Sequence, residues 1–173
     1  MTDLTITNAI FLGVLQGFTE WLPISSSGHL VIAQALLGIS VPAAFDIVIM
    51  AGTIAALLIY FRTMLYELAC GFLSGEPSAR KYFLYIVIAG IGTAFLGFLG
   101  KPFFTGLFAE PFIVSLLIIV TGIFLLIVSS VRVPDGDLTP KSALVIGLAQ
   151  GIAVAPGISR SGSTIGAALL FGI

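Results

Sequence analysis

The chain contains one 26-residue pattern twice, and this repeat restricts its fold more than any other feature. Residues 13–38 and 147–172 align without a gap at an offset of 134 positions, and ten of the 26 aligned pairs are identical. In each copy an apolar stretch leads into a polar break with Pro, Gly and Ser, and a second apolar stretch follows. Inside a very apolar protein, a pair of broken helices of this kind builds a polar site within a membrane.

The composition places the whole chain in the membrane. Only 9% of the 173 residues are charged and 58% are hydrophobic, with a mean hydropathy of +1.19. A soluble domain carries about 25% charged residues, so this chain has too little polar surface to face water. We therefore expect an all-α, multi-pass membrane protein. The net charge of −1 gives no reason to expect a nucleic-acid partner.

Apolar stretches of two lengths predict two kinds of helix. Three stretches approach the roughly 20 residues that cross a bilayer, and they predict spanning helices over about 45–61, 82–100 and 112–130. The stretches beside the two breaks are too short to cross alone. Because non-helical backbone at membrane depth needs protein or water around it, each pair predicts a re-entrant helical hairpin, over 8–38 and 143–173.

The number of crossings predicts the symmetry of a single membrane domain over residues 1–173. Three spans between two copies of one unit invert the second copy, so the polar breaks are expected to meet near the midplane around a pseudo-two-fold axis. The first repeat would cover 1–134, and the second would begin with the hairpin at 143. A complete duplication at this offset needs roughly 268 residues. We therefore expect the counterparts of the three spanning helices to be absent.

A carboxylate lies at the end of the first apolar stretch. Glu20 follows Gln16 by four positions, so both side chains share one face of a helix. A carboxylate inside a membrane costs several kcal/mol unless it meets water, a cation or a metal. Either Glu20 is a structural carboxylate near the interface, or it is a general base or metal ligand. In the second case Gln16 offers a further oxygen to a hard divalent cation.

The first break combines hydroxyl groups with the single histidine of the chain. Ser25, Ser26 and Ser27 precede Gly28 and His29. A serine run at a helix start is often only an N-cap, and a lone histidine is often a structural residue. A hydroxyl beside an imidazole is also the pairing that activates a serine nucleophile, and histidine carries protons near neutral pH.

The second break supplies a cation. Gly157, Ser159, Arg160, Ser161 and Thr164 lie in or just after it, directly before an apolar stretch. Glycine lets backbone approach a ligand closely, and a helix N-terminus offers free N–H groups and positive charge. Arginine adds a fork that suits phosphate oxygens. The simpler alternative is a structural Arg160 paired with Glu20; the combination favours an anion site, with phosphate as the anion.

The two copies carry different residues at three positions that are candidates for catalysis or anion binding. The offset pairs three residues of the first hairpin with chemically unlike residues of the second: Ser26 with Arg160, His29 with Ser163 and Glu20 with Val154. One break thus holds the base and nucleophile candidates, and the other holds the anion clamp. This division of roles favours an enzyme over a transporter built from similar halves.

Three motifs resemble the undecaprenyl-diphosphate phosphatase family of the bacitracin-resistance type. They are the [E/Q]-x-x-x-E motif, the L-P-x-S-S-x-G-H segment and P-G-x-S-R-S-G-x-T, found here at Gln16–Glu20, Leu22–His29 and Pro156–Thr164. The resemblance implies two inverted repeats and release of inorganic phosphate from undecaprenyl diphosphate. The product is the lipid carrier of cell-wall (peptidoglycan) synthesis. It also implies dependence on a divalent cation, Mg²⁺ or Ca²⁺.

The resemblance implies a site made of three groups of residues. The catalytic group is Glu20, Ser26, His29 and Arg160; the substrate-binding group is Ser25, Ser27, Gly157, Ser159, Ser161 and Thr164; the metal ligands are Glu20 and Gln16. Ser26 is the expected nucleophile and His29 its proton partner, with direct attack by water, activated by Glu20 or His29, as the other route. The partners expected are a polyprenyl diphosphate lipid, the bilayer and a second copy of the chain in a homodimer.

The chain departs from the family in two ways. The family has further helices after the second motif, and Met50 stands where a polar side chain is expected near the site. Two other functions therefore stay open. One is a transporter or flippase of a phosphorylated lipid with the same inverted architecture, and the other is an inactive fragment.

Overall fold

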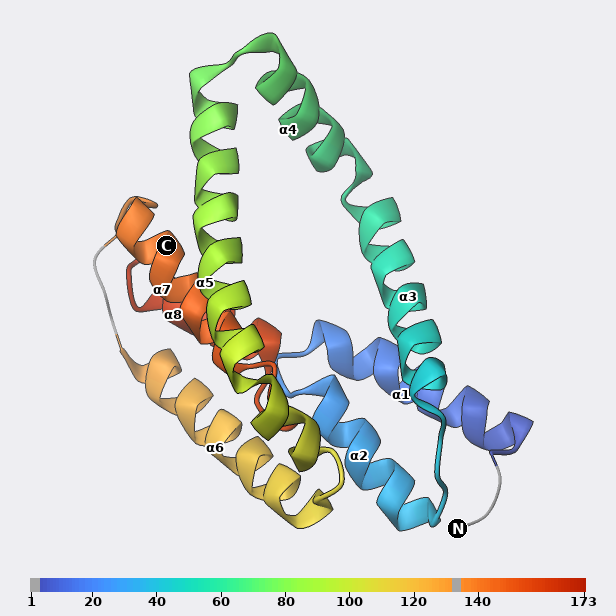
Figure 1. The fold of residues 1–173 in the computed structure, drawn as a ribbon. Coiled ribbons are helices and arrows are strands. Elements are labelled where there is room, and N and C mark those ends of the chain that lie inside the picture. The colour runs from blue at the N-terminus through green and yellow to red at the C-terminus, as the bar shows by residue number, and fades with distance from the viewer. Residues whose placement is uncertain (1–3, 132–134) are drawn as a thin grey trace.

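The computed structural model describes residues 4–131 and 135–173, and every regular element in them is a helix. The predicted end of the first repeat, at residue 134, lies outside the described residues. The helices are shown in Figure 1: α1 (Ile6–Trp21), α2 (Ser26–Leu37), α3 (Ala43–Tyr60), α4 (Arg62–Ser74), α5 (Pro77–Leu107), α6 (Pro111–Ser130), α7 (Pro140–Ile152) and α8 (Arg160–Leu169). The all-α prediction is confirmed.

Proline and glycine set five of the helix boundaries in the described residues. Helices α5, α6 and α7 begin at Pro77, Pro111 and Pro140, where the missing N–H needs no partner. Helices α2 and α4 end at Gly38 and Gly75, both with positive φ, a backbone conformation that costs glycine little. The chain therefore encodes these ends locally.

Two helices are long and apolar enough to cross a membrane. By length and composition these are α5 and α6, and the bent pair α3 and α4 makes a third if it counts as one span. They correspond to the predicted spans at 82–100, 112–130 and 45–61. Many large apolar side chains of these helices are exposed, as lipid contact requires. The structure therefore supports a membrane protein.

The structure shows further helical residues beside the first two predicted spans. The segment between them holds α4, which is bent by 70° from α3. Helix α3 ends at Tyr60 and α4 begins at Arg62, whose Nη1 donates to the Ile59 carbonyl at 2.9 Å. Helix α5 continues past residue 100 and contains Pro102. Local hydroxyl bonds and neighbouring groups make proline tolerable in a membrane helix, and Thr105 donates to the Lys101 carbonyl at 3.0 Å.

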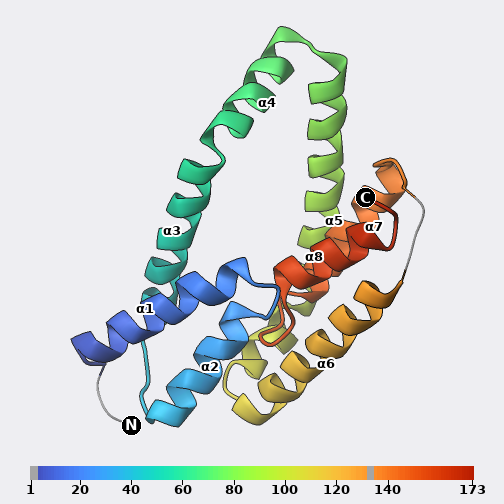
Figure 2. The same cartoon turned by 180° about the vertical axis from the view of Figure 1, so that it is seen from behind.

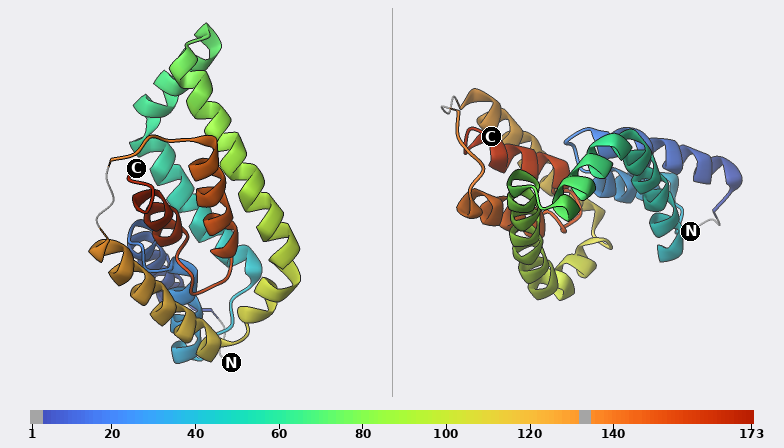
Figure 3. Two further views of the ribbon diagram at one scale, coloured as in Figure 1. Left: turned by 90° about the vertical axis from the view of Figure 1, so that its left-hand side faces the viewer. Right: turned by 90° about the horizontal axis from the view of Figure 1, so that it is seen from above.

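The helices form two groups that meet at the breaks. Helices α1, α2 and α3 make one group, and α5 to α8 make the other, with α4 joining them at the far end (Figures 1 and 2). Within the second group α7 packs along α5, and α6 contacts both α2 and α8. The view from above places α1 and the C-terminal end of the chain on opposite sides (right panel of Figure 3). The connections α1–α2 and α7–α8 lie together in the centre.

The two breaks touch through glycine. A β-carbon on Gly28 would lie 2.8 Å from the Gly157 Cα, which is too close for any side chain. Gly157 has φ +95°, a conformation that other residues rarely adopt. The expectation that the breaks come together is met by this backbone contact.

Candidate active site

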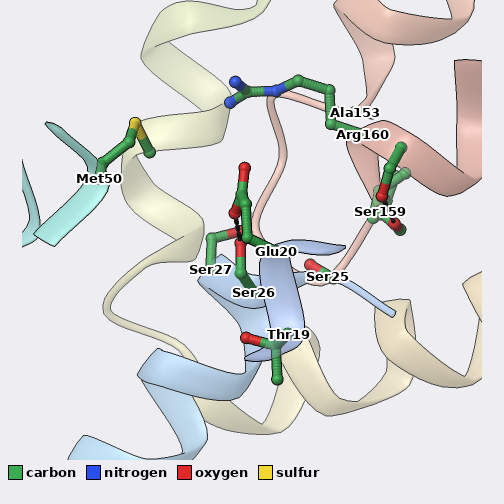
Figure 4. A pocket seen from close by; sticks show the side chains of 11 residues that line it. Thr19, Glu20, Ser25, Ser26, Ser27, Met50, Ala153, Ser159 and Arg160 are labelled. Atoms are coloured by element: carbon green, nitrogen blue, oxygen red, sulfur yellow. Dashed lines mark hydrogen bonds between the residues drawn. The ribbon is translucent and has the colours of Figure 1, made fainter. Parts of the chain in front are cut away.

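A cavity opens where the two breaks meet, and both hairpins contribute to its wall (Figure 4). Most predicted site residues line it, together with four others. The lining consists of Thr19, Glu20, Ser25, Ser26, Ser27, Met50, Ala153, Ile158, Ser159, Arg160 and Ser161. Residues about 130 positions apart in sequence thus share one polar space.

The first hairpin supplies a carboxylate and a hydroxyl that are bonded to each other. Glu20 lies in the last turn of α1, where Gln16 Nε2 donates to its Oε2 at 3.0 Å. The Ser26 hydroxyl donates to the same oxygen. Gln16 is 2% exposed and Glu20 is half-buried. The amide therefore holds the carboxylate from behind, and the hydroxyl meets it from the cavity.

The second hairpin supplies an unpaired cation. Ser159 caps α8 by accepting from the Gly162 N–H at 3.0 Å, which makes Arg160 the first residue of the helix. The Arg160 side chain extends over Glu20 (Figure 4). In the part of the chain that the structure describes, its guanidinium makes no hydrogen bond or ion pair. Together with the positive end of α8, it offers an anion two independent attractions.

Ser25 holds the hairpins together. Its hydroxyl oxygen accepts from the Gly28 N–H at 3.3 Å and from the Gly157 N–H, across the breaks, at 3.1 Å. Ser25 also has φ 68°, a strained value for a residue other than glycine. A second contact runs from the Ser161 hydroxyl to the Leu22 carbonyl at 3.5 Å. Ser25 lines the cavity, but both hydrogen bonds that its hydroxyl oxygen accepts come from backbone N–H groups.

Four predicted site residues lie outside the cavity wall. Gln16 lies behind Glu20, and the backbone of Gly157 is packed against Gly28. The Thr164 hydroxyl bonds back to the Arg160 carbonyl at 3.0 Å. His29 Nδ1 lies 2.8 Å from the Ser25 carbonyl. Because a carbonyl only accepts, this nitrogen carries the proton in that contact and Nε2 is the basic one.

Four lining residues were absent from the predicted site: Thr19, Met50, Ala153 and Ile158. Thr19 donates to the Leu15 carbonyl at 2.7 Å, so its hydroxyl is engaged. Met50 comes from α3 and closes the side of the cavity away from the second hairpin (Figure 4). The departure at Met50 was a signal that this position lies near the site. Ala153 and Ile158 lie between α7 and α8, in the segment of the second break, and their types give no chemical signal.

Comparison with known proteins gives consistent matches. Residues 9–173 match the family model described as bacitracin resistance protein BacA. An undecaprenyl-diphosphatase of Syntrophotalea carbinolica is 43% identical over 178 residues, covering 98% of this chain and 68% of that protein. An undecaprenyl-diphosphatase of Korarchaeum cryptofilum is 39% identical over 180 residues, covering 97% and 68%. The chain thus spans about two thirds of the length of these relatives.

Proposed function

Because the chain belongs to the bacitracin resistance protein BacA family, we propose that it hydrolyses undecaprenyl diphosphate to undecaprenyl phosphate and inorganic phosphate. The reaction regenerates the lipid carrier of cell-wall synthesis. One observation carries the proposal: the unpaired guanidinium of Arg160 shares a cavity with the bonded pair Glu20 and Ser26. An anion clamp beside an activated hydroxyl suits phosphoryl transfer better than transport.

In this proposal the second hairpin binds the diphosphate. The Arg160 fork would hold two phosphate oxygens, and the N-terminus of α8 would add its positive end. Ser27 and Ser161 line the same cavity and would donate further hydrogen bonds. Charge that builds up on the transferred phosphoryl group would then be stabilised by groups already in place.

The first hairpin would perform the bond exchange. Ser26 Oγ attacks the terminal phosphorus while its proton passes to Glu20, its hydrogen-bond partner. The bond between that phosphorus and the bridging oxygen breaks, and undecaprenyl phosphate leaves. Water then attacks the phosphorus of the phosphoserine and the Ser26 Oγ–P bond breaks; Glu20 returns its proton to Ser26, and both protons of the water stay on the inorganic phosphate that leaves. Trapping of phosphoserine separates this route from direct attack by water.

We assign the proton to Glu20 rather than to His29, the partner expected from the sequence. The Ser26 hydroxyl meets the carboxylate, whereas the His29 ring meets the Ser25 carbonyl at 2.8 Å. The role left to His29 is positional, since its ring bonds the carbonyl of Ser25, the residue whose hydroxyl joins the two breaks. Loss of the imidazole should then cost less activity than loss of the carboxylate.

A divalent cation fits the oxygen donors of this site only with help from substrate. Glu20, the Gln16 amide oxygen and Ser26 would hold it. No group of three or more His, Cys, Asp or Glu that suits a metal occurs in the residues described. Mg²⁺ often binds through one or two carboxylates plus substrate phosphates, which matches this donor set. Its contribution when bound would be to neutralise negative charge on the diphosphate.

We also propose that the hairpins α1–α2 and α7–α8 are re-entrant and form inverted repeats in one multi-pass domain of the inner membrane. The repeated motif and the meeting of the two breaks support this arrangement. Association into a homodimer stays a prediction. The transporter alternative is not favoured, because the matched relatives are named as phosphatases.

Phosphate release by the purified full chain tests the function. In detergent micelles with undecaprenyl diphosphate, we expect inorganic phosphate and undecaprenyl phosphate in equal amounts. EDTA should stop release, and added Mg²⁺ or Ca²⁺ should restore it. Intact lipid diphosphate after prolonged incubation with either cation would contradict the proposal, and unchanged release in EDTA would contradict the metal assignment alone.

A further inference from the structure

Thr121 lies in the middle of α6 and joins that helix to the second break. It is 5% exposed. Its hydroxyl donates to the Gly157 carbonyl at 2.9 Å and accepts from the Ser159 N–H at 3.3 Å. One side chain therefore satisfies two backbone groups of the loop that ends at Arg160.

This use of a hydroxyl differs from that of other threonines and serines in the long helices. Thr53 and Ser115 each donate to the carbonyl four residues earlier in their own helix, the usual arrangement in a helix interior. Thr93 makes this local bond and also contacts α7. Thr121 has no such bond among the contacts of the described residues. Both hydrogen-bonding functions of its hydroxyl go to a loop from a different part of the chain.

The loop is thereby held from two sides. Thr121 takes the Gly157 carbonyl, and Ser25 of the first hairpin takes the Gly157 N–H at 3.1 Å. Ser159, whose N–H also bonds Thr121, is the N-cap that starts α8. Arg160 follows directly, so the start of α8 and the root of the guanidinium are fixed relative to α6.

We propose that Thr121 is a positioning residue for the anion clamp: its hydroxyl sets the backbone that aims Arg160 into the cavity. The inference rests on the proposed phosphatase function. Thr121 does not line the cavity, so it acts through Gly157 and Ser159 rather than on substrate. A displacement of about 1 Å at a reacting group is enough to lower a rate 100-fold.

The test compares three variants of the full chain in detergent micelles. Thr121→Val keeps the shape of the side chain and removes the hydroxyl, and Thr121→Ser keeps the hydroxyl. Thr93→Val is the matched control, because the Thr93 hydroxyl likewise lies 2.9 Å from a carbonyl of another helix, that of Gly147, outside the cavity wall. Two readouts are measured: kcat and KM for phosphate release, and the rate at which phenylglyoxal labels Arg160, followed by mass spectrometry.

We expect Thr121→Val to lower kcat by about 10- to 100-fold and to change the Arg160 labelling rate by about twofold or more. Thr121→Ser and Thr93→Val should keep both values within about twofold of the parent. Parental kcat and labelling in Thr121→Val would overturn the inference, and so would equal losses in Thr121→Val and Thr93→Val.

The labelling readout separates this inference from the proposed function. If the parent chain releases no phosphate, the function fails, and the labelling still decides the role of Thr121. A change confined to Thr121→Val then supports the positioning role, and identical labelling in all four proteins refutes it.

Discussion

The first hairpin, α1–α2, and the second hairpin, α7–α8, share the residues that shape their breaks and differ in those that face the cavity. Ser25 and Ser159 are equivalent by the offset, and each accepts the N–H three residues later, at 3.3 and 3.0 Å. The next position is Ser26 in one hairpin and Arg160 in the other. An equivalent serine therefore caps both α2 and α8. The next position carries a hydroxyl in α2 and a guanidinium in α8.

The hairpins also differ in how their first helices are packed. Gly147 and Gly151 of α7 lie against α5, and a β-carbon on Gly147 would overlap the Ala89 backbone. Their equivalents in α1 are Gly13 and Gly17, where an added β-carbon meets no described atom within 4 Å. Closely spaced small residues let membrane helices approach. The same pair of glycines thus serves a helix contact in one copy and is open in the other.

The largest effect should come from the carboxylate of the first hairpin. Glu20→Gln keeps the size of the side chain but removes its capacity to take the Ser26 proton. We expect phosphate release to fall by about 10²–10⁴-fold. The control is Glu67→Gln, an exposed carboxylate on α4, which should leave kcat unchanged. Near-parental activity in Glu20→Gln would show that the proton goes elsewhere.

Loss of the cation in the second hairpin should cost nearly as much. Arg160→Ala removes the fork that stabilises charge on the phosphoryl group, and we expect about a 10²–10³-fold loss in rate. Arg160→Lys should recover part of it, since lysine restores the charge without the bidentate geometry. Arg80→Ala, at an exposed site on α5, is the control. Equal rates for Arg160→Ala and the parent would remove the anion clamp from the mechanism.

The glycine comparison predicts opposite effects on stability. Gly147→Ala forces a β-carbon into the Ala89 backbone and should lower the free energy of unfolding by about 1–3 kcal/mol. Gly13→Ala adds a methyl group in open space within a helix and should raise it by about 0.5–1 kcal/mol. Thermal unfolding in one detergent measures both. If the free energy of unfolding changed in the same direction in both variants, α1 would be packed at Gly13 as α7 is at Gly147.

The smallest expected effect is a difference in stability between variants of the two N-cap serines, Ser25 and Ser159. Ser159→Ala removes an N-cap and should cost about 1 kcal/mol. Ser25→Ala removes an N-cap and also the acceptor of the Gly157 N–H, and an unpaired buried donor adds about 1 kcal/mol or more. Unfolding measurements on the two variants should therefore rank Ser25→Ala as the less stable. The reverse order would show that the bond between the hairpins contributes little.

Much of the fold and site follows from the sequence because its signals are local. Pro23 and Pro156 break the apolar stretches, and Ser25 and Ser159 cap the helices that follow. The prediction that Glu20 and Arg160 lie together is met, since both line one cavity. Thr121 was missed, although a polar residue inside an apolar span is itself a signal of function.

Other features depended on contacts that no local pattern encodes. The 70° bend between α3 and α4 and the passage of α5 through Pro102 could not be derived from apolar length. The sequence paired Ser26 with His29, which is three residues away. In the structure the hydroxyl meets Glu20, and the histidine meets the Ser25 carbonyl. Proximity along the chain was a poor guide here because a helix break redirects side chains.

The sequence alone determined that this is an apolar helical protein with two broken hairpins of unlike polar content, because hydropathy, proline, glycine and capping serines act within a few residues. Only the tertiary structure decided which hydroxyl meets the carboxylate, and which serine and threonine hold the backbone ahead of Arg160. Ser26 and Glu20 are six residues apart, on either side of a helix break. The bonds of Thr121 and Ser25 to Gly157 join residues 36 and 132 positions apart, whose relative placement is fixed by packing rather than by local preference.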